Sequence, residues 1–341
     1  MKKTVALIYG GEGREHEISE RSAKNLYAFI DRERFEVVPI FISQTGDWYI
    51  RNNLDGDFIE TFPVRYKGKS GFLLFGEVMR VDAAIPILHG DFGEDGKVQG
   101  ALDVAHIPYV GCGAMAGAIC SDKILTKSIA DYLSIPTVKW LAFTGDTSAV
   151  EAREQAEKKL SYPMFIKPSG LGSSIGAQAV NTPSEFISAF MAAAEAHDSR
   201  VLVEELADIL YEQECAYLSY EKRVILSPSG RIDCNGRFYD FDLKYSTNRT
   251  ANAASGILPD EKTADDMRRW ARLISDFIGI RHIARIDFFI TSDKGVFFNE
   301  INTMPGLTDS SLYPLMCEDM GLKKGEFINL VLEDLLYDRH I

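Results

Sequence analysis

Strand-like and helix-like patterns alternate along residues 4–110, and this alternation restricts the possible folds more than any other feature of the sequence. Three apolar, β-branched runs of strand length occur at residues 4–9, 36–42 and 83–88. A helical pattern between the first two runs places four residues on one stripe, namely Ile18, Ser22, Leu26 and Phe29. Alternating strands and helices favour a small parallel sheet covered by helices. Residues 46–80 are punctuated by glycine and are expected to form a peripheral hairpin or loop.

The remaining chain contains a further set of helices and strands, so we predict a mixed α/β (α+β) fold with two or three domains for 341 residues. Ser121 is expected to cap a helix that has Asp122 in its first turn. Residues 182–185 form a capping-box pattern that opens another helix. An amphipathic helix is predicted around residues 267–278. Strands are predicted at residues 162–167, 177–180, 201–203, 282–290 and 295–301.

Composition excludes several classes of protein. The net charge of −13 argues against a nucleic-acid partner, because such proteins need a broad basic surface. No apolar run approaches the roughly 20 residues that span a bilayer. The first strand-like run is too short for a signal peptide and lacks a cleavage site, so a cytoplasmic location is expected. The five cysteines are scattered and never spaced C-x-x-C, which favours reduced thiols over disulfides or zinc ligands.

The last two predicted strands bear the strongest chemical signal. Side chains alternate across a strand, so Arg285 and Asp287 share one face, as do Glu300 and Asn302 on the next strand. If the two strands pair, two carboxylates, an amide and a guanidinium converge. Hard oxygen ligands of this kind suit Mg²⁺. A structural ion pair of Arg285 is the alternative, but four polar groups inside apolar strands are costly without a ligand and favour the metal site.

Three other segments suggest ligand contacts, each with an ordinary structural alternative. Lys167 precedes the glycine- and serine-rich segment 169–176, which can hold phosphate oxygens or simply turn a hairpin. Glu15 lies where the first helix begins and can bind an ammonium group or stabilise the helix dipole. His89 directly follows a predicted parallel strand, where ligands of open sheets gather, or caps backbone there. The glycines at 10, 11 and 13 fail the dinucleotide fingerprint, because His16 replaces its third glycine.

Taken in order, these segments resemble the D-alanine–D-alanine ligases of the ATP-grasp superfamily. The resemblance covers nearly the whole chain. Its segments are Gly10-Gly11 with Glu15-His16-Glu17-Ile18-Ser19, His89-Gly90 with Gly93-Glu94-Asp95-Gly96 and Gln99-Gly100, Ser121-Asp122-Lys123, Ile166-Lys167-Pro168 with Gly172-Ser173-Ser174 and Gly176, Phe238-Tyr239-Asp240 with Lys244-Tyr245, Arg285-Ile286-Asp287, and Asn299-Glu300-Ile301-Asn302-Thr303-Met304-Pro305-Gly306 with Ser311-Leu312.

The resemblance implies three domains, with ATP between the second and third. They are an N-terminal substrate-binding domain at 1–113, a central ATP-grasp domain at 114–205 and a C-terminal catalytic domain at 206–341, with a lid loop at about 238–258. Two Mg²⁺ ions are expected on Asp287, Glu300 and Asn302, with Mn²⁺ as a substitute, and assistance by a monovalent cation is left open. The residues implied around the nucleotide are Lys123, Lys167 and Ser174 at the phosphates, Glu204, Glu205 and Ala207 near adenine, Glu212 at the ribose, and Phe238.

The implied reaction joins two D-alanine molecules through an acyl phosphate, for bacterial peptidoglycan precursors. Glu15 would bind the first ammonium, with His89 beside the first carboxylate, and Ser173 and Tyr245 would lock the lid through Glu15. The second substrate would contact Lys244, Ser311 and Leu312. Arg285 and the Gly306 N–H would form the oxyanion hole. The resemblance also implies a homodimer.

Several alternatives remain open. The acceptor can be D-serine or D-lactate in related enzymes, although Tyr245 and Leu312 both match the D-alanine type. Another ATP-grasp carboxylate–amine ligase would share the fold and the chemistry. A non-catalytic nucleotide-binding protein would be expected to lack metal ligands or the oxyanion arginine, and all are present here. A nicotinamide-dependent dehydrogenase is disfavoured by the broken fingerprint.

Overall fold

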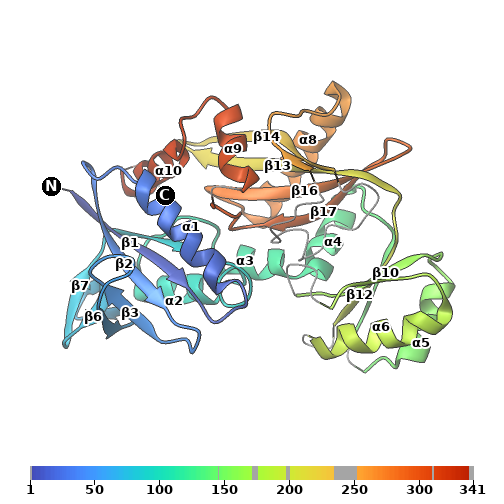
Figure 1. Cartoon of the computed structure of the whole chain (residues 1–341), viewed down its shortest axis with the longest axis horizontal. Coiled ribbons are helices and arrows are strands. Elements are labelled where there is room, and N and C mark those ends of the chain that lie inside the picture. The colour runs from blue at the N-terminus through green and yellow to red at the C-terminus, as the bar shows by residue number, and fades with distance from the viewer. Residues whose placement is uncertain are drawn as a thin grey trace.

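In a computed structural model of the chain, sheets and covering helices succeed one another from the N-terminus to the C-terminus (Figure 1). The structure describes residues 2–144, 146–170, 176–196, 200–233, 252–308 and 311–337. Within these ranges there are two sheets of five strands, one of four and one of three. The mixed α/β fold expected from the sequence is therefore confirmed. No helix within the described ranges combines the length and the apolarity that a membrane span requires.

The N-terminal part contains the predicted parallel sheet. Strand β1 (Lys3–Gly10) pairs in parallel with both β2 (Phe35–Ile42) and β8 (Ala83–Ile87). Helix α1 (His16–Phe29) packs on β1, because Ile18, Ser22 and Leu26 are buried on one stripe. Helix α2 (Lys97–Ala105) follows β8. All three predicted strands and the predicted helix are confirmed.

Residues 46–80 hold more structure than the single hairpin or loop expected. The antiparallel strands β3 (Trp48–Arg51) and β4 (Phe58–Thr61) extend the first sheet, which has the order β4-β3-β2-β1-β8. Three further strands form a separate antiparallel sheet, β5 (Pro63–Tyr66), β6 (Lys69–Leu74) and β7 (Glu77–Arg80). Strands this short carry too few residues for a clear alternation, so the sequence pattern did not reveal them.

The central part is a four-stranded antiparallel sheet with two covering helices. The sheet has the order β11-β10-β12-β9, and α5 and α6 lie on one side of it (Figure 1). Its elements are β9 (Trp140–Phe143), α5 (Ala149–Glu157), β10 (Met164–Pro168), β11 (Gln178–Val180), α6 (Pro183–Ala196) and β12 (Val201–Glu205). The hairpin β10–β11 confirms that the glycine- and serine-rich segment connects two strands.

The predicted cap at Ser121 is wrong by one residue. Helix α3 (Ala114–Ser121) ends at Ser121, and α4 (Lys123–Tyr132) begins after Asp122. The Asp122 carboxylate accepts hydrogen bonds from the backbone N–H groups of Ile124 and Leu125. An aspartate at the N-cap satisfies N–H groups that have no partner within the helix. The sequence pattern had assigned Asp122 to the first turn of the helix instead of to its N-cap.

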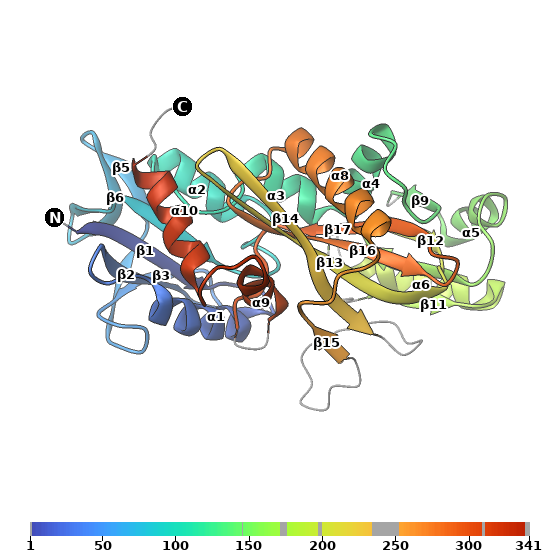
Figure 2. The ribbon, with the colours of Figure 1, turned by 90° about the horizontal axis from the view of Figure 1, so that it is seen from above.

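The C-terminal part is a second five-stranded sheet with the order β15-β14-β13-β16-β17. Its strands are β13 (Ile209–Tyr220), β14 (Arg223–Asp233), β15 (Asn252–Ala254), β16 (Ile283–Thr291) and β17 (Val296–Asn302). Helix α8 (Glu261–Ile278) covers one face together with α3 and α4 (Figure 2). Buried α8 residues recur at helical spacing, namely Ala264, Met267, Ala271, Ile274 and Ile278, so the predicted amphipathic helix is confirmed.

Helices α9 (Leu312–Asp319) and α10 (Glu326–Tyr337) return the chain to the N-terminal part, where both lie close to α1 in Figure 1. One apolar cluster joins Leu7 of the first sheet, Leu218 of β13 and Phe327 of α10. Asn329 ties α10 to the end of α1, since its Nδ2 donates to the Phe29 carbonyl. The first and last parts of the chain therefore share one core.

Candidate active site

The face of the C-terminal sheet opposite α8 gathers the polar residues of the two last strands. Arg285 pairs with Asn302 and Asp287 with Glu300 in the β16–β17 register, as predicted. Next to this pair the register shifts, so that Phe288 faces Phe298 and joins the α8 side. The shift places Phe298 in the core while Glu300 and Asn302 stay on the polar face. The hairpin thus concentrates four polar side chains within one apolar sheet.

Arg285 is held by two buried carboxylates. Its Nε and Nη2 donate to the Asp287 carboxylate at 2.8 and 2.7 Å, and its Nε lies 3.2 Å from Glu214 Oε1. Burial alone would lower the pKa of Arg285, but Asp287, Glu214 and Glu300 outweigh it and raise the pKa further above its ordinary value. The guanidinium is therefore a fixed positive charge. Glu214 belongs to β13 and was not among the predicted site residues.

Asp287, Glu300 and Asn302 form an oxygen-rich set that fits Mg²⁺. The Asn302 Oδ1 is buried and accepts no hydrogen bond from the residues that the structure describes. A bound cation would satisfy a buried oxygen of this kind. Within the described ranges, no group of three or more His, Cys, Asp and Glu side chains is suited to a metal, and the set named here contains two carboxylates and one amide. Lys123 Nζ lies 3.6 Å from Glu300.

Lys167 reaches into a buried ion cluster on the central sheet. Its Nζ lies 2.7 Å from Glu204 Oε2, and Lys127 Nζ lies 2.6 Å from Glu204 Oε1. Burial would raise the pKa of Glu204, but the two lysines outweigh it and lower the pKa to about 2. Burial lowers the pKa of Lys127, with Glu204 opposing this effect. The Glu204 side chain therefore contacts both lysines, and the adenine contact expected at this residue through its backbone stays a prediction.

The other predicted nucleotide residues lie along the connection from β12 to β13. The Glu205 carboxylate accepts a hydrogen bond from the Ser161 N–H at 3.0 Å and lies 3.3 Å from Lys139 Nζ. The carbonyl of Ala207 accepts from the Ile209 N–H. Glu212 is half-buried on β13, opposite Phe289 of β16. Glu204 and Glu205 therefore end the last strand of the central sheet, and Glu212 lies near the start of the C-terminal sheet.

Glu15 and His89 meet at the carboxyl end of the first sheet. Glu15 occupies the N-cap position of α1 without a side-chain capping hydrogen bond, and a Cβ atom on Gly90 would come within 2.6 Å of its Oε2. His89 is buried, with Nε2 3.1 Å from the Ser22 hydroxyl and Nδ1 3.5 Å from Glu94 Oε1. Burial raises the pKa of Glu94, with His89 opposing the effect and Glu15 adding to it. The two predicted first-substrate residues are thus neighbours.

The segment after β17 carries the predicted oxyanion and acceptor residues. A Cβ atom on Gly306 would come within 2.8 Å of the Ser311 hydroxyl, so the two residues adjoin. The Ser311 hydroxyl accepts from the Thr308 N–H, and Leu312 is buried at the start of α9. Asn25 of α1 donates from Nδ2 to the Leu307 carbonyl at 2.6 Å. This bond ties the segment to the helix that begins at Glu15.

Five predicted site residues lie outside the described residues, namely Ser173, Ser174, Phe238, Lys244 and Tyr245. The same is true of residues 238–251 of the predicted lid. The other predicted site residues lie at five places. These are the hairpin face with Arg285, the lysine cluster around Glu204, the connection from β12 to β13, the pair of Glu15 with His89, and the segment after β17.

Four residues that contact the candidate site were not predicted from the sequence, namely Asn25, Glu94, Lys127 and Glu214. Glu94 lies within a recognised segment, so its proximity to His89 was an available signal. Lys127 follows Lys123 by one helical turn, which was a second available signal. Asn25 and Glu214 make contacts across large sequence separations, and their local patterns gave no indication of this.

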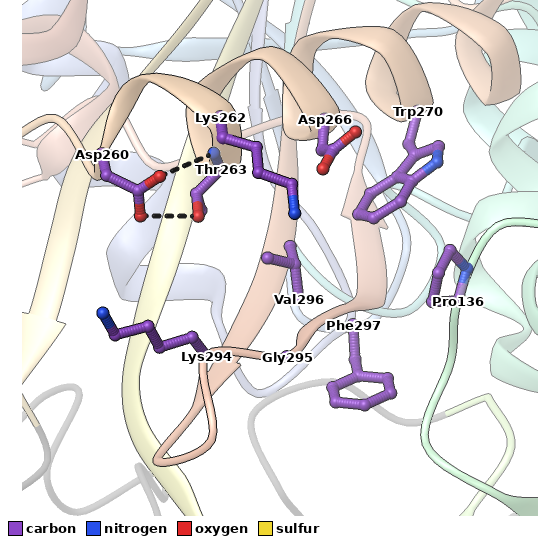
Figure 3. Close-up of a pocket in the computed structure, with 10 residues that line it drawn as sticks. All are labelled: Pro136, Asp260, Lys262, Thr263, Asp266, Trp270, Lys294, Gly295, Val296 and Phe297. Atoms are coloured by element: carbon purple, nitrogen blue, oxygen red, sulfur yellow. Dashed lines mark hydrogen bonds between the residues drawn. The ribbon is translucent and has the colours of Figure 1, made fainter.

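A separate pocket of about 370 Å³ lies where the first turns of α8 meet the β16–β17 turn (Figure 3). Trp270 and Val296, which line it, belong to the apolar layer under α8. The Asp260 side chain in the same lining caps α8 through Thr263. The pocket therefore adjoins the helix-covered face of the sheet, opposite the polar face of Arg285.

Comparisons with known proteins agree along the whole chain. Residues 4–112 match the family described as D-ala D-ala ligase N-terminus, and residues 129–333 match D-ala D-ala ligase C-terminus. The D-alanine–D-alanine ligase of Chlorobium limicola is 35% identical over 97% of this chain and 96% of its own length. The VanG D-Ala:D-Ser ligase from Enterococcus faecalis superposes with a TM-score of 0.88 at 30% identity, covering 97% and 99% of the two chains. The D-alanine–D-alanine ligase from Coxiella burnetii superposes with a TM-score of 0.87 at 28% identity, covering 99% and 95%.

Proposed function

The chain belongs to the D-alanine–D-alanine ligase family, and on this premise we propose that it joins two D-alanine molecules into a dipeptide while ATP becomes ADP and phosphate. The single observation that carries the proposal is the convergence of Arg285, Asp287, Glu300 and Asn302 on one sheet face, with Lys123 beside Glu300. That arrangement offers a metal-binding oxygen set, a phosphate-binding cation and an oxyanion donor together.

The first chemical step activates a carboxylate. A carboxylate is a poor electrophile, so transfer of the γ-phosphoryl group of ATP to the first D-alanine must convert one of its oxygens into a leaving group. Lys123 and Lys167 would bind the phosphates and offset their charge. Asp287, Glu300 and Asn302 would hold Mg²⁺, two ions in our proposal, which supplies Lewis-acid charge stabilisation when bound.

The second step is attack by the amine of the second D-alanine. The carbonyl carbon becomes tetrahedral, its oxygen gains negative charge, and phosphate then leaves as the peptide bond forms. Arg285 and the Gly306 N–H would donate hydrogen bonds to that oxygen. Asp287 and Glu214 fix the guanidinium in advance, so no reorganisation is needed as the charge develops.

The remaining residues would bind and enclose the substrates. Glu15 would bind the first ammonium, with His89 at the first carboxylate. Lys244 and Ser311 would bind the second carboxylate, and Leu312 the second side chain. Ser173 and Tyr245 would close the lid and protect the acyl phosphate from water. We also propose that the enzyme is a homodimer and that it acts in the cytoplasm.

The decisive experiment measures ADP release from the purified protein with Mg²⁺, ATP and D-alanine, and identifies the product by mass spectrometry. D-serine, D-lactate and L-alanine are tested in parallel as acceptors. D-alanine-dependent ADP release with the homodipeptide as product is expected. A mixed product with D-serine, made in preference to the homodipeptide, would instead support D-alanine–D-serine ligation, the activity named for the VanG structure. Nucleotide binding without turnover of any substrate would overturn the enzymatic proposal.

A further inference from the structure

Lys127 is a fully buried lysine that none of the steps above uses. Its side chain has no exposed area and ends 2.6 Å from Glu204. A lysine is almost never fully buried unless it is paired with an opposite charge, because removing an ammonium group from water is costly. It lies on α4, one helical turn after Lys123, and reaches the β12 carboxylate that also contacts Lys167. The lysine therefore connects a helix and a strand that each contribute to the nucleotide site.

The charge balance of this cluster gives Lys127 a role. Glu204 carries one negative charge between two ammonium groups, so one net positive charge remains. If Glu204 paired with Lys167 alone, the pair would be neutral. Movement of the Lys167 ammonium to a phosphate would then strand a buried carboxylate, and this cost would be subtracted from nucleotide affinity. A permanent second partner for Glu204 removes that cost.

We propose that Lys127 is a positioning residue that neutralises Glu204 and thereby frees Lys167 to bind the phosphates of ATP. The inference rests on the proposed function, because it assigns Lys167 to the nucleotide. Lys127 does not contact the nucleotide in this role. It acts through Glu204. Because Lys127 already neutralises Glu204, this carboxylate can orient Lys167 and still leave the Lys167 ammonium available to a phosphate. The side chain of Lys167 is about 10% exposed and that of Lys127 is not exposed at all, so Lys167 is the one of the two lysines that solvent reaches.

The test compares equilibrium binding of ATP and of adenosine to the full chain and three variants. Adenosine has the base and the ribose without phosphates, so it reports the rest of the site. In Lys127→Met, an apolar side chain of similar length replaces the ammonium, and Glu204 keeps Lys167 as its only partner. We expect the Kd for ATP to rise at least tenfold and the Kd for adenosine to change less than twofold. The KM for ATP should rise more than kcat falls.

The double variant Lys127→Met/Glu204→Gln separates this role from a structural one. Removing the carboxylate together with its partner leaves Lys167 free again, so ATP binding should return to within about threefold of the wild type. A purely structural lysine would not be rescued by this second change. The double variant has no carboxylate at position 204 that lacks a second partner, so we expect it to fold even if Lys127→Met does not. Its ATP binding can then be measured on its own. Lys3→Met is the matched control, since Lys3 pairs with Asp82 on the first sheet, away from the nucleotide.

Three results would overturn the inference. They are unchanged ATP binding in Lys127→Met, a parallel loss of adenosine binding, and failure of the double variant to recover ATP binding. None of them depends on peptide formation. A wild-type protein that binds ATP but makes no dipeptide would refute the proposed function and leave this test intact.

Discussion

Replacement of Arg285 by alanine separates the chemical role of this residue from its structural role. The guanidinium makes two hydrogen bonds to Asp287 and contacts Glu214, and both carboxylates are buried. Loss of one oxyanion donor typically raises the barrier by about 3 kcal/mol, which corresponds to roughly a hundredfold fall in kcat. Because Arg285 acts on the second step, the yield of dipeptide per ADP should fall as well.

The same substitution has a predictable cost in stability. Removing one partner of a buried ion pair typically costs about 3–5 kcal/mol, because the remaining charges lose their compensation. Arg285→Ala leaves two carboxylates in this condition. The deficit relative to the wild type should shrink as the pH falls, since protonation neutralises them. Arg272→Ala is the control, because Arg272 forms an exposed pair with Asp276 on α8, worth about 0.5 kcal/mol or less.

The assay quantifies dipeptide and ADP at saturating ATP and D-alanine, and urea denaturation determines the fraction folded. Rates are expressed per folded enzyme. A folded Arg285→Ala protein whose kcat for dipeptide formation lies within threefold of the wild type would refute the oxyanion role. A variant as stable as the control would refute the ion-pair argument.

Three further predictions concern the surroundings of the site. Asn25→Ala removes the hydrogen bond to the Leu307 carbonyl, so we expect about 1 kcal/mol less stability and several-fold less dipeptide per ADP, measured as above. A variant that forms as much dipeptide per ADP as the wild type would exclude a positioning role for this bond. Gly90→Ala introduces a Cβ atom 2.6 Å from Glu15 Oε2 at a backbone φ of +69°. The KM for D-alanine should therefore rise at least tenfold in initial-rate assays. An unchanged KM would argue against the role of Glu15. Burial, followed by the charge of Arg281, lowers the pKa of His282 to about 3. Below pH 6.5 the unfolded chain therefore binds a proton at this residue while the folded chain does not. The free energy of unfolding should fall by about 2 kcal/mol between pH 7 and pH 5 for this reason. Urea denaturation of His282→Gln should show a weaker dependence over this range, and an identical pH profile would contradict the assignment.

Much of the fold could be predicted because local patterns and tertiary structure agree. The β16–β17 hairpin is the clearest case, since the alternation of Arg285, Asp287, Glu300 and Asn302 predicted the pairing that the structure shows. Helix α8 is another, because its apolar spacing predicted the face that packs on the sheet. In these segments the local spacing of polar and apolar residues is sufficient to predict which face of the strand or helix is buried.

The remainder depends on contacts between segments distant in sequence. Glu204 was predicted near adenine, but only the structure shows that its carboxylate lies between Lys127 and Lys167. The cap of α4 differed by one residue because Ser121 and Asp122 are both good capping residues, and in the structure Ser121 belongs to α3 while Asp122 caps α4. The site roles themselves remain predictions, and those of Ser173, Lys244 and Tyr245 fall outside the described residues.

The core shared by the first sheet and the last helices has a consequence for synthesis of the protein. Leu7 and Leu26 emerge from the ribosome early, yet part of their apolar environment comes from Phe327 and Val331 of α10. Part of the apolar surface of the N-terminal sheet therefore stays uncovered until nearly the entire chain has been made. During that interval the nascent chain exposes a surface that chaperones recognise. Truncation before α10 should thus leave an aggregation-prone N-terminal part, although every strand of its own sheet would be present.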